Sequence, residues 1–326
     1  MFGKKFKVTL IDTKEYFEFT PSVIKSIVNP KFFKKIKIFH KDYLKKSNII
    51  LGKVSKVKKN YVLIREEKFF FDYLILASGS YYHSPIKSEN VSSLSRFEDL
   101  MNVHDKIKEA KKIVVIGGGA VGVEISSELI TKYPKKNISV FTYSKTLLER
   151  NNERTKFLAK DFLLKKGVKI FFEKEVFFNR GIFLKNKKKV DADYFFVCTG
   201  IRLNNEFLKK SSKIILNKRG GISVNNFLQV NGSKNIFAGG DLTGISEEKT
   251  AQTAIIHAKV ISNNIINLER GKNLKKYAPK KRPMVIFLGR LTGIFEYGNF
   301  SIRGFPAAIL KKLIEIRELT KFKINL

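Results

Sequence analysis

The stretch Ile113-Val-Val-Ile-Gly-Gly-Gly-Ala-Val-Gly-Val-Glu124 decides the fold of this chain. A run of apolar residues typical of a strand ends in Gly117, Gly119 and Gly122, and a helical pattern follows through Leu129. The pattern G-x-G-x-x-G between a strand and a helix is the dinucleotide-binding fingerprint. Its glycines allow a sharp turn, close approach of the backbone to a pyrophosphate and tight packing of helix on strand. The sequence therefore predicts a nucleotide site here, with a structural glycine-rich turn as the alternative.

The same plan of elements occurs twice along the chain. After Gly117 come the strands Ile138–Thr142 and Tyr194–Gly200, the second of which ends in a turn of small residues. Earlier, Val8–Asp12 is a strand that ends in an acid, and Tyr73–Gly79 is a strand that ends in a small turn. Repeated units of this kind build doubly wound domains. We therefore expect an α/β fold with two nucleotide-binding domains.

The first copy begins in the middle of this plan. Asp12 in the first copy corresponds to Thr142 in the second copy, where the glycine loop begins at Gly117, well before Thr142. At the same distance before Asp12, the corresponding glycine would lie upstream of Met1. The first copy therefore lacks its opening strand, its glycine loop and most of its first helix. That strand is central in a doubly wound sheet, so its loss would leave strand edges unpaired and apolar faces uncovered. We expect the missing N-terminal segment to be encoded upstream or as a separate fragment.

The composition is that of a globular protein with a large excess of positive charge. The 326 residues, 43% of them hydrophobic, suffice for two domains and a substantial core. We interpret the net charge of +35 mainly as compositional bias toward Lys, Ile, Asn and Phe, because the basic residues are spread along the chain. Attraction to an anionic membrane surface is the second interpretation. Nucleic acid is disfavoured as a partner, because no nucleic-acid-binding module is recognisable.

Five ordered motifs carry a family resemblance. They are Val8–Asp12 with the following Tyr16, Phe19, Thr20 and Pro21, then Phe71–Ser80, Lys112–Leu129, Asp193–Asn204 and Asn235–Asp241. In type and order these motifs resemble those of the two-dinucleotide-binding flavoprotein superfamily. Within it, they are similar to the type II NADH:quinone oxidoreductases and to the ferroptosis-suppressor branch of the apoptosis-inducing-factor-like proteins.

The resemblance implies two interleaved Rossmann-like dinucleotide-binding domains and a short C-terminal module. Residues 1–100 and 228–275 would form the FAD-binding domain, without its first strand and glycine loop. Residues 101–227 would form the NAD(P)H-binding domain, and residues 276–326 the C-terminal module. The implied reaction is hydride transfer from NAD(P)H to FAD, followed by electron transfer to a quinone or another small acceptor.

Several alternatives to this reaction stay open. A soluble flavin-dependent NAD(P)H oxidase or redox-protein reductase would keep the flavin and change the acceptor. A non-catalytic NAD(P)H-binding remnant would follow from the missing FAD glycine loop. The choice between NADH and NADPH is undecided, because Thr142 stands where an acid would favour NADH. A homodimer is a further option for the assembly.

The only cysteine, Cys198, excludes part of the related chemistry. It lies within an apolar strand, so we expect a small buried core residue. Disulfide reductases need a redox cysteine pair, and sulfide-oxidising relatives also work through cysteines, so neither chemistry can run within this chain. The four histidines and Cys198 show no metal-ligand spacing, and we predict no metal site.

The expected cofactor-binding residues come from the strand ends and glycine turns. Asp12 would accept hydrogen bonds from a ribose diol, with a solvated strand-end acid as the alternative. Asp241 would accept hydrogen bonds from the ribityl hydroxyls of the flavin, and Gly240 would allow its close approach. The whole set is Asp12, Ala77, Ser78, Gly79, Gly117, Gly119, Gly122, Thr199, Gly200, Gly240, Asp241 and Ala251.

Three residues are the expected catalytic groups. The resemblance puts Glu124 near the nicotinamide, although an acid in the first helical turn also suits the helix dipole. Lys249 would stabilise negative charge on the reduced flavin or on the acceptor oxygen, unless it is a solvated lysine. Gln252 fits the type II pattern A-Q-x-A-x-Q, whose second glutamine would fall at Ile256. His257 is equally a buried structural histidine or a site residue.

The C-terminal residues suggest contact with a membrane surface. A basic stretch covers residues 270–282, and a helix is predicted from Pro306 to Thr320. An apolar stripe along this helix, made of Ala307, Ile309, Leu310, Leu313 and Ile314, would dock on a membrane or pack on the protein. The sequence has neither a recognisable signal peptide nor an apolar run of the ~18–20 residues needed to span a bilayer. The expected location is the cytoplasm, with peripheral attachment to the inner face of the cell membrane as an option.

Overall fold

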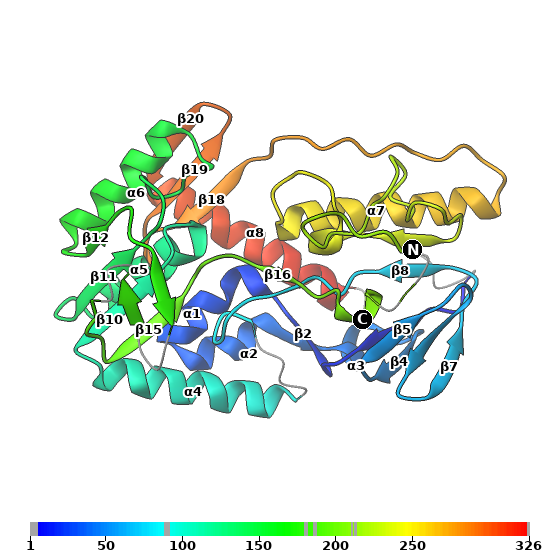
Figure 1. Cartoon of the computed structure of the whole chain (residues 1–326), viewed down its shortest axis with the longest axis horizontal. Helices are drawn as coiled ribbons and strands as arrows, with labels where there is room; N and C mark the ends of the chain where they lie inside the picture. Colours follow the sequence, from blue (N-terminus) through cyan, green and yellow to red (C-terminus); the bar gives the residue numbers. More distant parts are fainter. Residues whose placement is uncertain are drawn as a thin grey trace. The chain divides into compact units, whose positions relative to one another are not determined.

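The computed structural model describes residues 6–87, 92–178, 182–184, 188–209, 211 and 214–324. By their contacts, the residues form two compact units, each built from three separate stretches of chain. Unit 1 comprises Met1–Phe17, Phe39–Tyr81 and Ile201–Lys280, and unit 2 comprises Glu18–Ile38, Tyr82–Gly200 and Lys281–Leu326. Both contain strands and helices, as the predicted α/β class requires (Figure 1).

The two units do not coincide with the cofactor domains expected from the sequence. The units divide the chain by contacts, whereas the expected domains, 1–100 with 228–275 and 101–227, divide it by the cofactor that each would bind. The expected domain bounds therefore stay a prediction.

A four-stranded parallel sheet lies at the centre of unit 2 (Figure 1). Its strands are ordered β12 (Lys169–Phe171), β11 (Asn137–Phe141), β10 (Lys112–Ile116) and β15 (Tyr194–Val197). β10 pairs along both edges, and its apolar run from Ile113 onward is buried. Continuous apolar runs are typical of parallel strands that are covered on both faces. The strand before the glycine fingerprint is therefore the central one, as the motif requires.

The longer helices of unit 2 besides the C-terminal one include two that pack against this sheet and one that packs on the N-terminal short helices. They are α4 (Ser93–Glu109), α5 (Ala120–Lys132), which packs on β10 and β11, and α6 (Glu153–Lys165). The side chain of Asn152 accepts the N–H of Thr155 at 2.9 Å and so caps the N-terminus of α6. Shorter elements of this unit are η1 (Thr20–Ser22), α1 (Val23–Val28), η2 (Pro30–Phe32), α2 (Phe33–Ile36) and the hairpin of β13 (Val176–Phe178) with β14 (Ile182–Leu184).

The C-terminal residues of unit 2 form an antiparallel meander and a helix. The strands β18 (Met284–Phe287), β19 (Gly293–Tyr297) and β20 (Phe300–Gly304) pair in sequence order. The helix α8 (Phe305–Ile324) contains the predicted helix and is longer at both ends. In the described residues, no helix has both the length and the apolar character needed to cross a membrane.

Unit 1 contains two separate pairs of parallel strands. β1 (Thr9–Asp12) pairs with β4 (Asn48–Leu51), and β8 (Leu74–Leu76) pairs with β17 (Ile236–Ala238). Ile11 and Leu76 pack into the same apolar cluster, although their strands belong to different sheets. In unit 2 the matching strands β11 and β15 both pair with β10. The upstream segment expected from the sequence stays a prediction.

The other elements of unit 1 frame these strands. An antiparallel sheet contains β5 (Val54–Val57), β6 (Tyr61–Ile64) and β7 (Glu67–Phe70), and β9 (Ser80–Tyr81) pairs with β16 (Arg202–Leu203). Its helices are α3 (His40–Tyr43), η3 (Glu206–Leu208), η4 (Gly240–Leu242) and the long α7 (Ala251–Glu269). The strands β2 (Tyr16–Glu18) and β3 (Lys37–Phe39) contain the points where the chain leaves unit 1 and returns to it.

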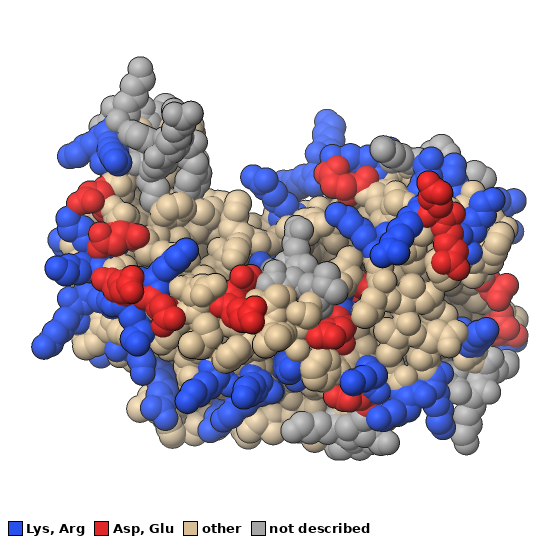
Figure 2. Space-filling model, turned by 90° about the horizontal axis from the view of Figure 1, so that it is seen from below, with Lys and Arg blue, Asp and Glu red and all other residues tan. Residues whose placement is uncertain are grey.

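The basic side chains are spread over the face that Figure 2 shows. Lys and Arg project from all parts of this face, and Asp and Glu lie among them. The basic residues on this face therefore do not gather into a single patch. The interpretation of the charge as compositional bias stays a prediction.

Candidate functional site

The glycine fingerprint of unit 2 forms a tight turn between β10 and α5. Gly117 has φ +117°, and a Cβ on it would overlap the carbonyl oxygen of Cys198 at the end of β15. A Cβ on Gly122 would overlap the carbonyl oxygen of Gly117. Gly119, the N-cap of α5, has nothing within 4 Å of its Cβ position. The backbone is therefore packed behind Gly117 and Gly122 and open in front of Gly119, and the helix N-terminus can receive an anion there.

The turn after β15 lies directly beside this loop. The N–H of Cys198 donates to the Ile116 carbonyl at 2.6 Å, whereas Thr199 and Gly200 are exposed. Cys198 is buried in the core, as predicted, and this burial raises the pKa of its thiol. Tyr82 also lies beside this turn, although it was not predicted from the sequence as a site residue. Burial raises its pKa, the nearby Cys198 adds to the rise, and a hydrogen bond with the Gly200 backbone opposes it.

Glu124 is buried on α5 and is held by residues from the C-terminal part of unit 2. Its carboxylate accepts the backbone N–H of Phe287 at 2.9 Å and a hydrogen bond from Lys311 Nζ. The Lys311 ammonium lies 4.1 Å from the centroid of the Phe287 ring. Glu124 thus joins α5 to β18 and α8, and its role near the nicotinamide stays a prediction. The pKa of the neighbouring Glu128 is raised, mainly by burial. The positive charge of Lys25 opposes this rise, and the negative charge of Glu124 adds to it.

Asp12 lies in unit 1 at the end of β1 and already has partners. Its carboxylate accepts the N–H of Lys14 at 2.9 Å and lies 3.3 Å from His40 Nε2, while His40 Nδ1 is 2.8 Å from the Tyr43 hydroxyl. Burial alone would raise the pKa of Asp12, but the hydrogen bonds and positive charges of His40 and Lys14 outweigh it and leave the pKa below the usual value. The side chain is 33% exposed, so an ionised carboxylate stays accessible to a ribose diol.

The small-residue turn after β8 is tied to Asn204. Ser78 Oγ donates to the Asn204 carbonyl at 2.8 Å, and the Asn204 N–H donates to the Gly79 carbonyl at 3.1 Å. Ala77 is exposed at the start of the turn. These bonds bring two separate sequence motifs together within unit 1.

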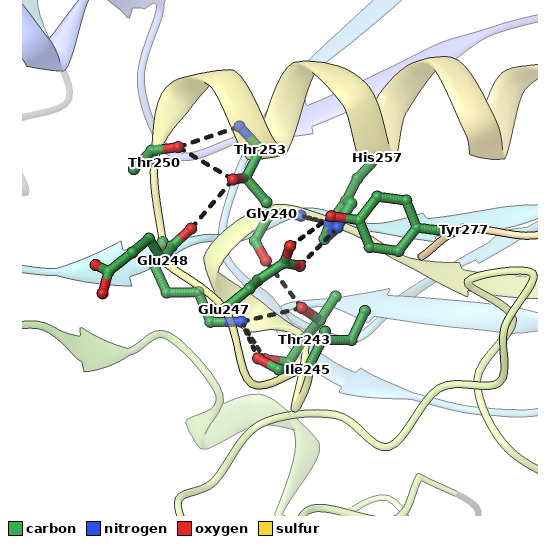
Figure 3. Close-up of polar contacts among 10 residues, drawn as sticks. Gly240, Thr243, Ile245, Glu247, Glu248, Thr250, Thr253, His257 and Tyr277 are labelled. Atoms are coloured by element: carbon green, nitrogen blue, oxygen red, sulfur yellow. Dashed lines mark hydrogen bonds and ion pairs between the residues drawn. The ribbon is translucent and has the colours of Figure 1, made fainter. Parts of the chain in front are cut away.

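The Gly240–Asp241 turn follows β17 and is held from two sides. Gly240 has φ +68°, and its N–H donates to His257 Nδ1 at 3.1 Å (Figure 3). Asp241 Oδ2 accepts a hydrogen bond from Ser80 Oγ at 2.6 Å. Ser80 was missed as a site residue, although it ends the quoted motif Phe71–Ser80. A carboxylate ordered in this way is prepared to accept hydroxyl groups of a ligand.

Lys249 is half-buried and binds the loop that follows this turn. Its Nζ donates to the carbonyl oxygens of Thr243 at 2.8 Å and Ile245 at 2.9 Å, and lies 3.2 Å from Thr243 Oγ1. Burial lowers the pKa of Lys249, and the charges of Glu247 and Asp241 oppose this change. The ammonium therefore already directs its three N–H groups at three oxygens. Its predicted action on the flavin or the acceptor stays a prediction.

The N-terminus of α7 is open to a ligand. Thr250 caps the helix by accepting the N–H of Thr253 at 3.2 Å, and the predicted residues Ala251 and Gln252 are exposed in the first turn. The first N–H groups of a helix lack partners within the helix and attract negative charge. This end of α7 therefore fits a ligand group that carries or develops negative charge.

Sequence comparisons place these features in a known context. A model of the family "Pyridine nucleotide-disulphide oxidoreductase" matches residues 3–258. The chain is 30% identical to apoptosis-inducing factor homolog A of Dictyostelium discoideum, over 95% of this chain and 84% of that protein. It is 31% identical to ferroptosis suppressor protein 1 of Xenopus tropicalis, over 93% of this chain and 85% of that protein. The family resemblance found in the motifs is thereby confirmed.

Two solved oxidoreductase-type structures share the fold of this chain. The sulfide:quinone oxidoreductase of Aquifex aeolicus matches with a TM-score of 0.80 and 19% identity, over 98% of this chain and 86% of that one. NDH2 from Plasmodium falciparum in complex with NADH matches with a TM-score of 0.79 and 17% identity, over 99% of this chain and 93% of that one. These likenesses confirm the fold. Together with the family match, they agree with FAD and NAD(P)H as the cofactors.

Proposed function

Because the chain belongs to the pyridine nucleotide-disulphide oxidoreductase family, we propose that it is an FAD-dependent NAD(P)H:quinone oxidoreductase. The observation that carries the proposal is the single, buried Cys198. These 326 residues hold no cysteine pair, so they cannot pass electrons through an internal disulfide, and the flavin would reduce an external acceptor. The relatives named ferroptosis suppressor protein 1 and NDH2, and the sulfide:quinone oxidoreductase, support a quinone as that acceptor.

In this proposal, different residues bind the two cofactors. The open backbone at Gly119 and the N-terminus of α5 would hold the pyrophosphate of NAD(P)H. Asp12 and Asp241 would accept hydroxyl groups of FAD, and the first turn of α7 would face its ring. FAD, when bound, supplies the electron-carrying chemistry, so the protein's part is positioning and electrostatics.

Absorbance and turnover of the purified chain test this function. We expect flavin absorbance near ~450 nm that bleaches on addition of NADH or NADPH, followed by reoxidation with a soluble quinone. Reoxidation by oxygen or a redox protein but not by quinone would favour the soluble oxidase or reductase. A chain that binds NAD(P)H but no FAD would leave the non-catalytic remnant as the better account.

We further propose that α8 docks on an anionic membrane surface. Its exposed apolar residues are Phe305, Ile309, Leu310, Leu313 and Ile316, with exposed Lys312 and Arg317 nearby. Of the expected stripe, Ile309, Leu310 and Leu313 are exposed, Ile314 is half-buried and Ala307 is buried within unit 2. An apolar face with basic neighbours is typical of helices that lie at an anionic interface.

Two acidic substitutions in the apolar stripe of α8 test the membrane proposal. Ile309→Asp/Leu313→Asp is expected to lower binding to phosphatidylserine-containing vesicles at least tenfold, because each buried aliphatic side chain contributes about 1.5–3 kcal/mol. Co-sedimentation with the vesicles measures the effect. Phe157→Asp on α6, at a residue that is 65% exposed, is the matched control and should bind as the unmodified chain does. Equal binding by all three proteins would exclude α8 as the docking surface.

A further inference from the structure

A buried histidine joins the Gly240–Asp241 turn to helix α7. His257 is fully buried, and its Nδ1 lies 3.1 Å from the Gly240 nitrogen (Figure 3). Its Nε2 lies 3.0 Å from Glu247 Oε1, and the other oxygen of Glu247 accepts a hydrogen bond from the Tyr277 hydroxyl. The Tyr277 ring meets the imidazole edge-on, with ring centroids 4.4 Å apart. The imidazole is therefore held through both nitrogens and across its face.

The partners of the two ring nitrogens assign the state of His257. A backbone N–H can only donate, so Nδ1 must offer a lone pair to Gly240. The ring proton then belongs on Nε2, where it faces the carboxylate of Glu247. Glu247 thus selects the tautomer in which Nδ1 is the acceptor.

The position of the Gly240–Asp241 turn depends on its contacts with α7. A Cβ on Gly239 would come within 3.1 Å of Ile261 Cδ1 and 3.4 Å of His257 Cβ, and a Cβ on Gly240 within 3.4 Å of Ala254 Cβ. The turn therefore lies directly on the side of α7 that carries these residues. The hydrogen bond to Nδ1 is a polar link between the turn and this helix.

We propose that His257 is a positioning residue for the flavin: its Nδ1 fixes the turn that carries Asp241 at a set distance from the N-terminus of α7. The inference rests on the proposed function, because it takes FAD to contact both elements. Binding a ligand between two elements that are already fixed avoids the loss of freedom that a mobile turn would suffer on binding. On this proposal, FAD affinity depends on the hydrogen bond that Nδ1 accepts from Gly240 and not on the volume of the imidazole ring.

Two amide variants separate the nitrogens of the ring. In His257→Asn, Oδ1 stands near the position of Nδ1 and can accept from Gly240, while Glu247 loses its partner on the ring. In His257→Gln, the longer amide reaches the position of Nε2 and can donate to Glu247, while Gly240 loses its acceptor. His257→Leu removes both the hydrogen bond from Gly240 and the contact with Glu247.

FAD affinity of the full apo chain, followed by quenching of flavin fluorescence, is the first measurement. We expect His257→Asn to bind within about threefold of the unmodified chain, and His257→Gln and His257→Leu to bind about tenfold more weakly, as for the loss of one hydrogen bond. Thermal unfolding of the apo variants is the second measurement. Here His257→Asn should be less stable than His257→Gln, because the asparagine leaves the buried Glu247 without a donor at position 257, whereas the glutamine supplies one.

The opposite orders of affinity and stability identify a positioning role. If FAD affinity follows stability across the variants, His257 is merely a packing residue and the inference is wrong. Should His257→Asn fail to fold, His257→Asn/Glu247→Gln removes the unpaired carboxylate and gives the same comparison. Equal FAD affinity for all variants overturns the inference alone, whereas an unmodified chain that binds no FAD overturns the proposed function as well.

Discussion

Gly122→Ala is expected to abolish NAD(P)H binding and to destabilise unit 2. The new Cβ would overlap the carbonyl oxygen of Gly117, a backbone atom that no rotamer change can move away. Relief requires α5 to shift from β10, and such overpacking costs about 1–3 kcal/mol or more. The shift also removes the helix N-terminus from the place where a pyrophosphate would bind. Thermal unfolding and titration with NADH and NADPH, followed by their fluorescence, measure both effects.

Gly119→Ala is the matched variant for the same loop. Nothing lies within 4 Å of its Cβ position, so the apo chain should unfold at the temperature of the unmodified protein. NAD(P)H affinity should nevertheless fall at least tenfold, because the methyl group projects into the space where the pyrophosphate approaches the backbone. Normal affinity in Gly119→Ala would contradict the assignment of this loop as the nucleotide site.

Arg96→Met is expected to give the second large effect, on stability. The Arg96 side chain is completely buried, donates through Nε and Nη2 to the two oxygens of Glu18 at 3.1 Å each, and reaches the Pro85 carbonyl at 2.8 Å. Removing the guanidinium leaves the Glu18 carboxylate buried without its counter-charge, which costs about 3–5 kcal/mol. Urea unfolding monitored by circular dichroism measures this loss.

The double variant Arg96→Met/Glu18→Leu tests the reason for that loss. If the penalty comes from the unpaired carboxylate, removing the carboxylate as well should recover most of the lost stability. A double variant as unstable as Arg96→Met would instead mean that Arg96 acts through its bond to Pro85 and its packing.

The local geometry of the glycine fingerprint could be predicted from the sequence. The glycine fingerprint depends on a few consecutive backbone conformations, so the turn at Gly117 and the central position of β10 follow directly from its residues. The long C-terminal helix was predicted in the same way, from a local pattern. The face that this helix exposes was predicted less well, because Ala307 is covered by contacts made within the folded unit.

The partners of the site residues could not be predicted, because they are distant in sequence. Glu124 is bound by Lys311 and Phe287, which lie 187 and 163 positions away. The sequence alone left His257 undecided between a structural and a site residue, since its contact with Gly240 depends on how α7 packs against β17. The sequence around Lys249 is typical of a site residue, yet its amine donates to the backbone carbonyl oxygens of Thr243 and Ile245. Hydrogen bonds to backbone atoms cannot be predicted from a pattern of side chains.

The assembly of each unit from three stretches of chain has a consequence during synthesis on the ribosome. Unit 1 needs residues up to Lys280, and unit 2 needs the strands and helix after Lys281. Neither unit can be complete when the first two hundred residues have left the exit tunnel, so both must wait with apolar strands exposed. Protection by a chaperone during translation, rather than domain-by-domain folding, is the route that this connectivity favours.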